Sequence, residues 1–421
     1  MRKVLAAIAV VAAVAVGFAW GFLADRNHVF PYRTAEAVAQ TLGLSPMPPA
    51  AVPRRREFKP GQVAALRALP YVSGTRDSDP QGNRVTTHVP QRVSPGANLY
   101  SPIEQGKAYL VDMYGRDLHE WSYGREPWQH TELLPDGSLL ATVKDQRLLA
   151  LDRRSRLRWE YRARFHHSLS LDGQGRIYAL TRRDVRIPEI HPEIDCVDDQ
   201  VVVLSPEGEL LRQFSLLEAV RQSSLGFLLL EVAHRPLDPE RGALDLLHTN
   251  HVAVFDGSLA HRSPLFARGN FLVSFRTLST IAILDRTTLE VLWAWGPNNV
   301  VHQHHPTLLD DGHLLVFDNG PGERKRSAVV ELDPLAGPGG RVEWSYTADD
   351  FYTASRGAAQ RLPNGNTLIT ESDTGYAFEV TPEGERVWVF ASPHFTDDGR
   401  RMAIWWMTRY PEDELEFLGR R

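Results

Sequence analysis

The feature that most constrains this chain is a unit of roughly 40–50 residues that recurs between about residues 85 and 395. Each unit contains four short runs typical of β-strands, separated by turn signals such as Pro135-Asp136-Gly137 and Asp311-Gly312. The last run of most units carries a tryptophan, as in Trp159-Glu160-Tyr161. Four strands per unit at this period are typical of the blades of a β-propeller, so the sequence predicts an all-β fold.

Six copies of the unit can be counted. A weak copy comes first, and the five clear copies that follow begin near His130, His166, His248, His304 and Arg356. We therefore predict a six-bladed β-propeller, with the tryptophan-bearing strands packing between blades. Residues 402–410 are predicted to pair with the first copy and close the ring, which removes exposed sheet edges. Residues 181–200 interrupt the period as an insertion, and residues 215–247 are predicted to be partly helical.

The N-terminus predicts a membrane anchor. Arg2 and Lys3 precede an uncharged, mostly apolar run from Val4 to Ala24, which as a helix is about 30 Å long and matches a bilayer core. The leading positive charge predicts a signal-anchor helix over residues 1–25, a single-pass protein of the inner membrane, and a catalytic domain in the periplasm. A cleaved signal peptide is the alternative. Residues 26–84 are interpreted as a stalk, and residues 85–421 as the propeller domain.

Charge and cysteine content exclude other classes. The formal net charge of the 421-residue chain is −5, so no basic footprint for nucleic acid is present. Cys196 is the single cysteine, which excludes an intramolecular disulfide and a cysteine-based metal site. The sequence leaves open whether the protein forms a homo-oligomer.

Histidines recur at one position of the repeat. His130, His166 and His305 each lie seven residues before a turn glycine, and His248 opens its unit in the same way. The first strand of a propeller blade lines the central channel, so histidines from several blades are expected to converge there. A histidine in such a cluster can be a metal ligand, a general base in hydrolysis or a nucleophile.

Two arginines favour an anionic substrate. Arg276 ends the second strand of the unit that His248 opens, and Arg356 opens a later unit. The planar guanidinium group suits tetrahedral oxyanions. A structural salt bridge is the alternative role for each arginine.

The ordered motifs resemble the bacterial arylsulfotransferase family, exported enzymes that use phenolic sulfate esters without a nucleotide donor. The resemblance covers about residues 125–395. It rests on four segments in order: His248-Thr249-Asn250, Ser274-Phe275-Arg276 with Trp293-Ala294-Trp295-Gly296, Gln303-His304 with Phe317-Asp318-Asn319-Gly320, and Ser355-Arg356 with Pro363-Asn364-Gly365-Asn366.

This resemblance implies a function and a set of site residues. It implies transfer of a sulfuryl group from an aryl sulfate to a phenol, with His304 as the nucleophile and no cofactor or metal. His248 and Arg276 match the supporting residues, and His167 is chosen over His166 as the third histidine. His305 is a rival nucleophile.

Two other functions stay open at this point. A non-catalytic envelope propeller that binds a ligand or a protein is the main alternative. A metal-dependent hydrolase is the second.

Overall fold

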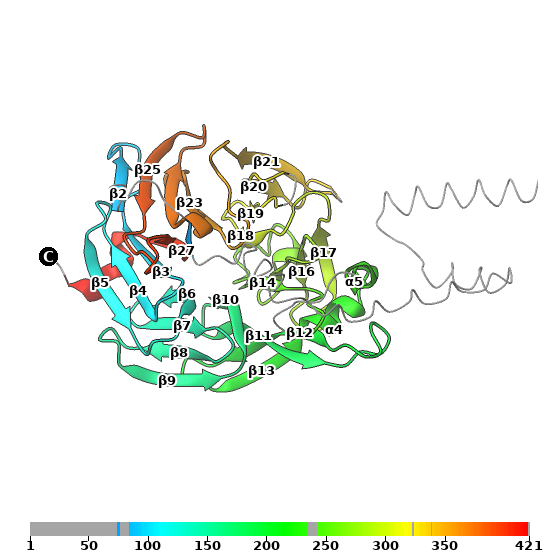
Figure 1. Cartoon of the computed structure of the whole chain (residues 1–421). Helices are drawn as coiled ribbons and strands as arrows, with labels where there is room; N and C mark the ends of the chain where they lie inside the picture. Colours follow the sequence, from blue (N-terminus) through cyan, green and yellow to red (C-terminus); the bar gives the residue numbers. More distant parts are fainter. Residues whose placement is uncertain (1–73, 76–83, 234–241, 322–323, 338, 420–421) are drawn as a thin grey trace, which may run out of the picture. The chain divides into compact units, whose positions relative to one another are not determined.

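The computed structural model describes residues 74–75, 84–233, 242–321, 324–337 and 339–419 (Figure 1). All of them belong to one compact unit of the chain, Leu69–Arg421. The predicted signal-anchor helix and most of the predicted stalk lie outside the described residues. Among the helices that are described, none combines the length and the apolar character needed to cross a bilayer.

Six antiparallel sheets surround a central axis, which confirms the predicted six-bladed β-propeller (Figure 1). The innermost strands of successive blades contact one another in a closed ring of β6, β10, β14, β18, β22 and β27.

Each blade is a sheet of four or five strands that follow one another from the axis outward. Blade 1 contains β27 (Ile404–Tyr410), β3 (Ala97–Pro102), β4 (Lys107–Val111) and β5 (Asp117–Ser122). Blade 2 contains β6 (Trp128–Leu133), β7 (Leu139–Val143), β8 (Arg147–Leu151) and β9 (Leu157–Arg162). Blade 3 contains β10 (Phe165–Leu171), β11 (Ile177–Val185), β12 (Cys196–Leu204) and β13 (Leu210–Ser215).

The second half of the ring has the same construction. Blade 4 contains β14 (Thr249–Val254), β15 (Phe271–Phe275), β16 (Thr280–Leu284) and β17 (Val291–Trp295). Blade 5 contains β18 (His304–Leu308), β19 (Leu314–Asp318), β20 (Ala328–Asp333) and β21 (Arg341–Tyr346). Blade 6 contains β22 (Ala358–Arg361), β23 (Thr367–Glu371), β24 (Tyr376–Val380), β25 (Arg386–Ala391) and a fifth strand, β2 (Arg84–His88).

The ring closes through the C-terminal part of the chain, as predicted. β27 pairs antiparallel with β3, from Ile404 opposite Pro102 to Tyr410 opposite Ala97. The C-terminal strand therefore forms the innermost strand of blade 1, while the rest of that blade comes from the N-terminal side of the domain. Two further short strands, β1 (Gly74–Thr75) and β26 (Arg401–Met402), also pair with each other.

Two stretches differ from the predicted period in different ways. The predicted insertion at 181–200 is largely a continuation of β11 and β12, which pair without interruption out to Val185 opposite Cys196. The stretch after β13 contains two helices, α4 (Leu216–Arg221) and α5 (Gly226–Ala233), as predicted. Short 3₁₀ helices cover Pro264–Phe266 (η1), Ser372–Thr374 (η2) and Glu412–Leu418 (η3).

The hydrophobic core consists of six clusters, one at each interface between neighbouring blades. The outer-strand tryptophans pack at these interfaces, as predicted, and four of them also reach across. The indole Nε1–H groups of Trp121, Trp159, Trp344 and Trp388 donate to carbonyls of Gly137, Pro206, Pro382 and Met113 on the next blade. This contact therefore links neighbouring blades at four of the six interfaces.

Candidate active site

Irregular pairing of the innermost strands determines where their side chains point. β6, β10, β14, β18 and β27 each carry a register shift next to their second strand. A bulge of this kind reorients a side chain that would otherwise alternate between the two faces of the strand. Four residues also have a left-handed backbone: His167, His248, His305 and Arg356, with φ angles of 53°, 46°, 48° and 59°. Non-glycine residues rarely adopt this conformation, and where they do, they are often found at functional sites.

His304 has one ring nitrogen committed to fixed partners. Its Nδ1 lies 2.7 Å from Oδ1 of Asn319 and 3.0 Å from the carbonyl oxygen of His302. The Asn319 amide nitrogen donates to the carbonyls of Thr353 and Arg356, which orients Oδ1 toward the ring. Because both partners of Nδ1 are acceptors, Nδ1 carries the proton in the neutral ring, and Nε2 keeps its lone pair.

The neutral form of His304 is strongly favoured. The side chain is buried, and burial together with the positive charge of Arg276 lowers the pKa of His304 well below 6.5, against the opposing hydrogen bond to Asn319. At neutral pH this residue therefore presents an unprotonated, oriented Nε2. A nucleophilic histidine needs this state.

His248 is paired with a carboxylate. Nδ1 of His248 lies 2.7 Å from Oδ2 of Asp245, whose Oδ1 accepts the backbone N–H of His248. Burial raises the pKa of Asp245, but the adjacent His248 outweighs it, and the pKa is lowered. An ionised Asp245 keeps the proton of neutral His248 on Nδ1 and orients the ring, as the third member of a catalytic triad does.

His167 lies between the other two histidines. Its ring centroid is 5.1 Å from that of His248 and 6.4 Å from that of His304. His166 points elsewhere: its Nδ1 meets Nδ1 of His167 at 2.9 Å, and its Nε2 lies 3.3 Å from Asp199. Burial and the charges of His248 and His166 lower the pKa of His167 well below 6.5.

The two candidate arginines have different surroundings. Arg276 is half-buried and forms no ion pair with a carboxylate in the described part of the chain, while its charge acts on His304. Arg356 instead donates to Oδ1 of Asp373 at 2.8 Å, the structural salt bridge named as its alternative role. Arg276 is therefore the guanidinium group that is available to a bound anion.

The structure thus brings the four predicted site residues His167, His248, Arg276 and His304 together at one place, which we call the site cluster. Trp405 on β27 joins it, with its ring 5.7 Å from His167 and its Nε1–H buried without a partner among the residues that the structure describes. Asp199, Asp245 and Trp405 were not identified from the sequence. The two aspartates do not occupy the repeat position at which histidines recur. Residues 402–410 were predicted to close the ring, and nothing in their sequence indicated that one of them would reach the site.

A second group of histidines, which we call the axis cluster, surrounds Trp406. His130, His251 and His305 come from blades 2, 4 and 5, with ring centroids 4.2, 6.5 and 4.9 Å from Trp406. His130 accepts the backbone N–H of Leu169 at Nδ1 and faces Glu132 at Nε2, so it bridges two blades. His305, the rival nucleophile, stacks edge-on against His251 at 4.9 Å. Burial and His130 lower its pKa to about 4.

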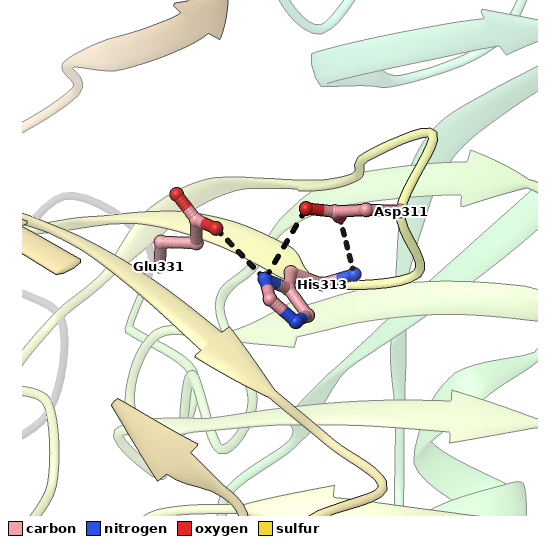
Figure 2. Close-up of side chains that lie close together, drawn as sticks. All are labelled: Asp311, His313 and Glu331. Atoms are coloured by element: carbon pink, nitrogen blue, oxygen red, sulfur yellow. Dashed lines mark hydrogen bonds and ion pairs between the residues drawn. The ribbon is translucent and has the colours of Figure 1, made fainter. Parts of the chain in front are cut away.

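A group with metal-ligand spacing lies elsewhere. Among the described residues, Asp311, His313 and Glu331 have ligand atoms that all lie within 4.8 Å of one another (Figure 2). Nδ1 of His313 is 2.8 Å from Glu331 and 3.4 Å from Asp311, and Glu331 also binds Arg361. These contacts form a satisfied network of hydrogen bonds and ion pairs. They occupy the end of the β18–β19 hairpin opposite to His304, which pairs with Phe317.

Comparison with known proteins identifies the family. The sequence model of the arylsulfotransferase (ASST) family matches residues 130–392, which include His167, His248, Arg276 and His304. The chain belongs to the arylsulfotransferase family. No protein with a curated description matches it.

Among solved structures, three that resemble this chain have low identity and TM-scores below 0.5. A protein of unknown function from Bacteroides caccae is 14% identical with a TM-score of 0.46, over 70% of this chain and 94% of that one. A streptogramin B lyase is 11% identical with a TM-score of 0.44, over 80% and 97%. The WD40 propeller domain of Doa1 is 14% identical with a TM-score of 0.43, over 81% and 98%. These structures are too distant to bear on function.

Proposed function

We propose that this protein transfers a sulfuryl group from an aryl sulfate to a phenol through a covalent intermediate on Nε2 of His304. The observation that carries the proposal is the fixed orientation of His304, whose Nδ1–H is held by Asn319 and the His302 carbonyl. The buried ring leaves one lone pair for reaction, on Nε2.

The chemistry follows from this arrangement. The Nε2 lone pair attacks sulfur, an N–S bond forms, and the bond between sulfur and the phenolic oxygen breaks. The phenolate leaves with the bonding electrons and takes a proton from a neighbouring histidine. A second phenol returns its proton to that histidine, its oxygen attacks sulfur, and the N–S bond breaks. Ping-pong kinetics are expected.

Charge on the sulfuryl oxygens needs preorganised donors, because sulfuryl transfer resembles phosphoryl transfer in spreading charge over the equatorial oxygens. Arg276 lacks a carboxylate partner among the described residues, and His248 is supported by Asp245. Both are suited to this task, and one such donor contributes about 3–4 kcal/mol of transition-state stabilisation. The indole ring of Trp405, beside His167, offers an aromatic surface for the phenyl ring.

The test is detection of the intermediate. The propeller protein is incubated with 4-nitrophenyl sulfate without acceptor, quenched in alkali and analysed by intact-protein mass spectrometry. We expect one added SO₃ group in the wild type and in His305→Gln, and none in His304→Gln. An adduct that persists in His304→Gln would place the nucleophile elsewhere. No adduct and no transfer in the wild type would favour the non-catalytic, ligand-binding alternative.

We also propose, from the sequence, that the apolar segment Val4–Ala24 anchors the chain in the inner membrane with the propeller in the periplasm. Added protease should then degrade the propeller in spheroplasts but not in intact cells. Protection in spheroplasts would contradict the proposed orientation.

A further inference from the structure

A buried chain of polar groups runs from the site cluster into blade 3. His167 Nδ1 lies 2.9 Å from His166 Nδ1, and His166 Nε2 lies 3.3 Å from Oδ1 of Asp199 and 3.3 Å from the carbonyl oxygen of Thr181. The side chains of His166 and Asp199 are 3% and 2% exposed, so water does not separate them from their partners. The chain therefore links a reacting group to a carboxyl group that does not touch substrate.

The short contact between two Nδ1 atoms permits two arrangements of protons. Only one of the two nitrogens can carry hydrogen when both rings are neutral. If His166 is protonated on Nε2, its Nδ1 accepts from Nδ1–H of His167, and Nε2 of His167 is a base. If Asp199 instead donates to Nε2 of His166, His166 donates to His167, and Nε2–H of His167 becomes an acid.

The surroundings of Asp199 make both arrangements accessible. Its Oδ2 accepts the backbone N–H of Thr249 at 2.6 Å, and the charged groups that act on it are Asp245 and Arg182. Arg182 is itself bound to Asp145. Burial and the negative charge of Asp245 raise the pKa of Asp199 to about 8, so its carboxyl group exchanges protons near neutral pH.

We propose that Asp199, acting through His166 and His167, stores the proton that the leaving phenolate takes and the acceptor phenol returns. The proposal rests on the proposed sulfuryl transfer. In the first half-reaction Nε2–H of His167 protonates the phenolate, Nδ1–H of His166 moves to His167, and the proton of Asp199 moves to Nε2 of His166. Asp199 ends ionised, and one phenol is released. The second half-reaction reverses each movement.

The neighbouring carboxylate has the opposite role. Asp245 is held ionised by His248, so this pair stabilises charge and cannot take up a proton on the carboxyl group. The two neighbouring aspartates thus have different roles in this scheme. Asp245 remains ionised throughout, whereas Asp199 releases and takes up a proton. Asp199 and His166 are positioning residues in this scheme, and His167 is the group that meets substrate.

The test uses donors whose leaving phenols differ in acidity. A 4-nitrophenolate leaves readily without a proton, whereas phenolate needs one. In Asp199→Asn the amide cannot release or take up a proton. We expect single-turnover release of phenol from phenyl sulfate, measured without acceptor, to slow by about 10²-fold or more, the usual contribution of general acid catalysis, while release of 4-nitrophenolate from 4-nitrophenyl sulfate is affected far less. Equal losses for both donors, or no loss for phenyl sulfate, would overturn the relay.

A matched control and the wild type itself separate the outcomes. Asp198→Asn removes the next carboxylate of β12, which binds Arg183 and Gln200 and points away from His166. It should leave the ratio of the two donors unchanged. If the wild type transfers no sulfuryl group to phenol, the proposed function fails. If it does so with an unchanged donor ratio in Asp199→Asn, the relay alone fails.

A measurement on the unaltered protein covers the case in which Asp199→Asn does not fold. Single-turnover release of the leaving phenol, measured without acceptor, is followed in mixtures of H₂O and D₂O. Several protons move together in the relay, so we expect a curved dependence on deuterium fraction for phenyl sulfate and a flat one for 4-nitrophenyl sulfate. A straight line for phenyl sulfate would indicate a single proton in flight and contradict the relay.

Discussion

The site cluster and the axis cluster are built from the same residue type at similar positions of the repeat, yet they differ in what their ring nitrogens contact. His304 and His248 each have one nitrogen held by a dedicated side chain, Asn319 or Asp245. In the axis cluster both ring nitrogens of His130 are occupied, one by the backbone N–H of Leu169 and the other by Glu132. Both ring nitrogens of His251 are buried without a partner in the described structure.

This difference shows that a histidine near the axis does not have an oriented, available ring nitrogen merely because it lies there. Burial lowers the pKa of His304 and of His305 alike. What distinguishes His304 is a partner that orients one nitrogen and a neighbouring cation, Arg276, that fits an anionic substrate. His305, one residue along β18, packs against His251 and Trp406 instead.

The strongest test of the difference between His304 and His305 is to substitute each of them in turn. We expect His304→Gln to lower kcat for transfer from 4-nitrophenyl sulfate to phenol by at least about 10⁴-fold, as loss of a nucleophile does. His305→Gln should keep most of the activity, because its ring faces the axis cluster. Circular dichroism checks that both variants fold. The reverse ranking would make His305 the nucleophile.

The second prediction concerns the arginines. Arg276→Met removes the cation next to His304, and we expect a loss in kcat of about 10²–10³-fold, the usual effect of deleting one oxyanion donor. Arg356→Lys preserves a charge beside Asp373 and serves as the matched control with a much smaller loss. Steady-state kinetics with one donor and one acceptor compare them. Equal losses would mean that Arg356 also contacts the substrate.

The third prediction addresses stability in the axis cluster. His130→Phe keeps the ring against Trp406 but leaves the backbone N–H of Leu169 unpaired, so unfolding should become easier by about 1–3 kcal/mol. His130→Asn can return an acceptor at the position of Nδ1 and should recover part of that loss. Urea denaturation measures both. A site role for His130 would appear instead as lost activity with unchanged stability.

The smallest expected effect is the pH dependence of stability. Burial lowers the pKa of His305 to about 4, whereas the unfolded residue titrates near 6.5. The unfolded state therefore binds this proton first, and stability falls as the pH drops from 6.5 toward 4. Each such histidine contributes about 1 kcal/mol per pH unit. Buried Asp199, with its raised pKa of about 8, opposes the trend.

The measurement is urea unfolding at pH 6.5 and 5.5 for the wild type and His305→Asn. The variant should lose less stability between the two pH values, by about 1 kcal/mol. His313→Asn is the control, because this histidine lies outside both clusters and binds Glu331. An identical pH dependence in wild type and His305→Asn would show that His305 is not held neutral.

Local sequence patterns were sufficient to predict the architecture and the blades that supply the site residues. Repeat length, turn residues and alternating strands are local properties, so they identified six blades, the closing strand before Tyr410 and the helices after β13. The register of the repeat also selected His248 and the start of β18 with its two histidines, because equivalent strand positions converge on one axis. The family resemblance then chose His304 over His305. The choice of His167 over His166, and that of Arg276, additionally used the family resemblance.

The groups that each side chain faces depend on the folded ring and could not be predicted from sequence patterns. The bulges in β10 and β18 separate His167 from His166 and His304 from His305, and no spacing in the sequence encodes that reorientation. Asn319, directly after β19, and Asp199, on β12, reach their histidines from within the same blade, and Asp245 reaches His248 from the segment before β14, so their roles appear only in the folded blades. The tautomer of a histidine depends on the partner of its other nitrogen, and that partner is a property of the folded ring.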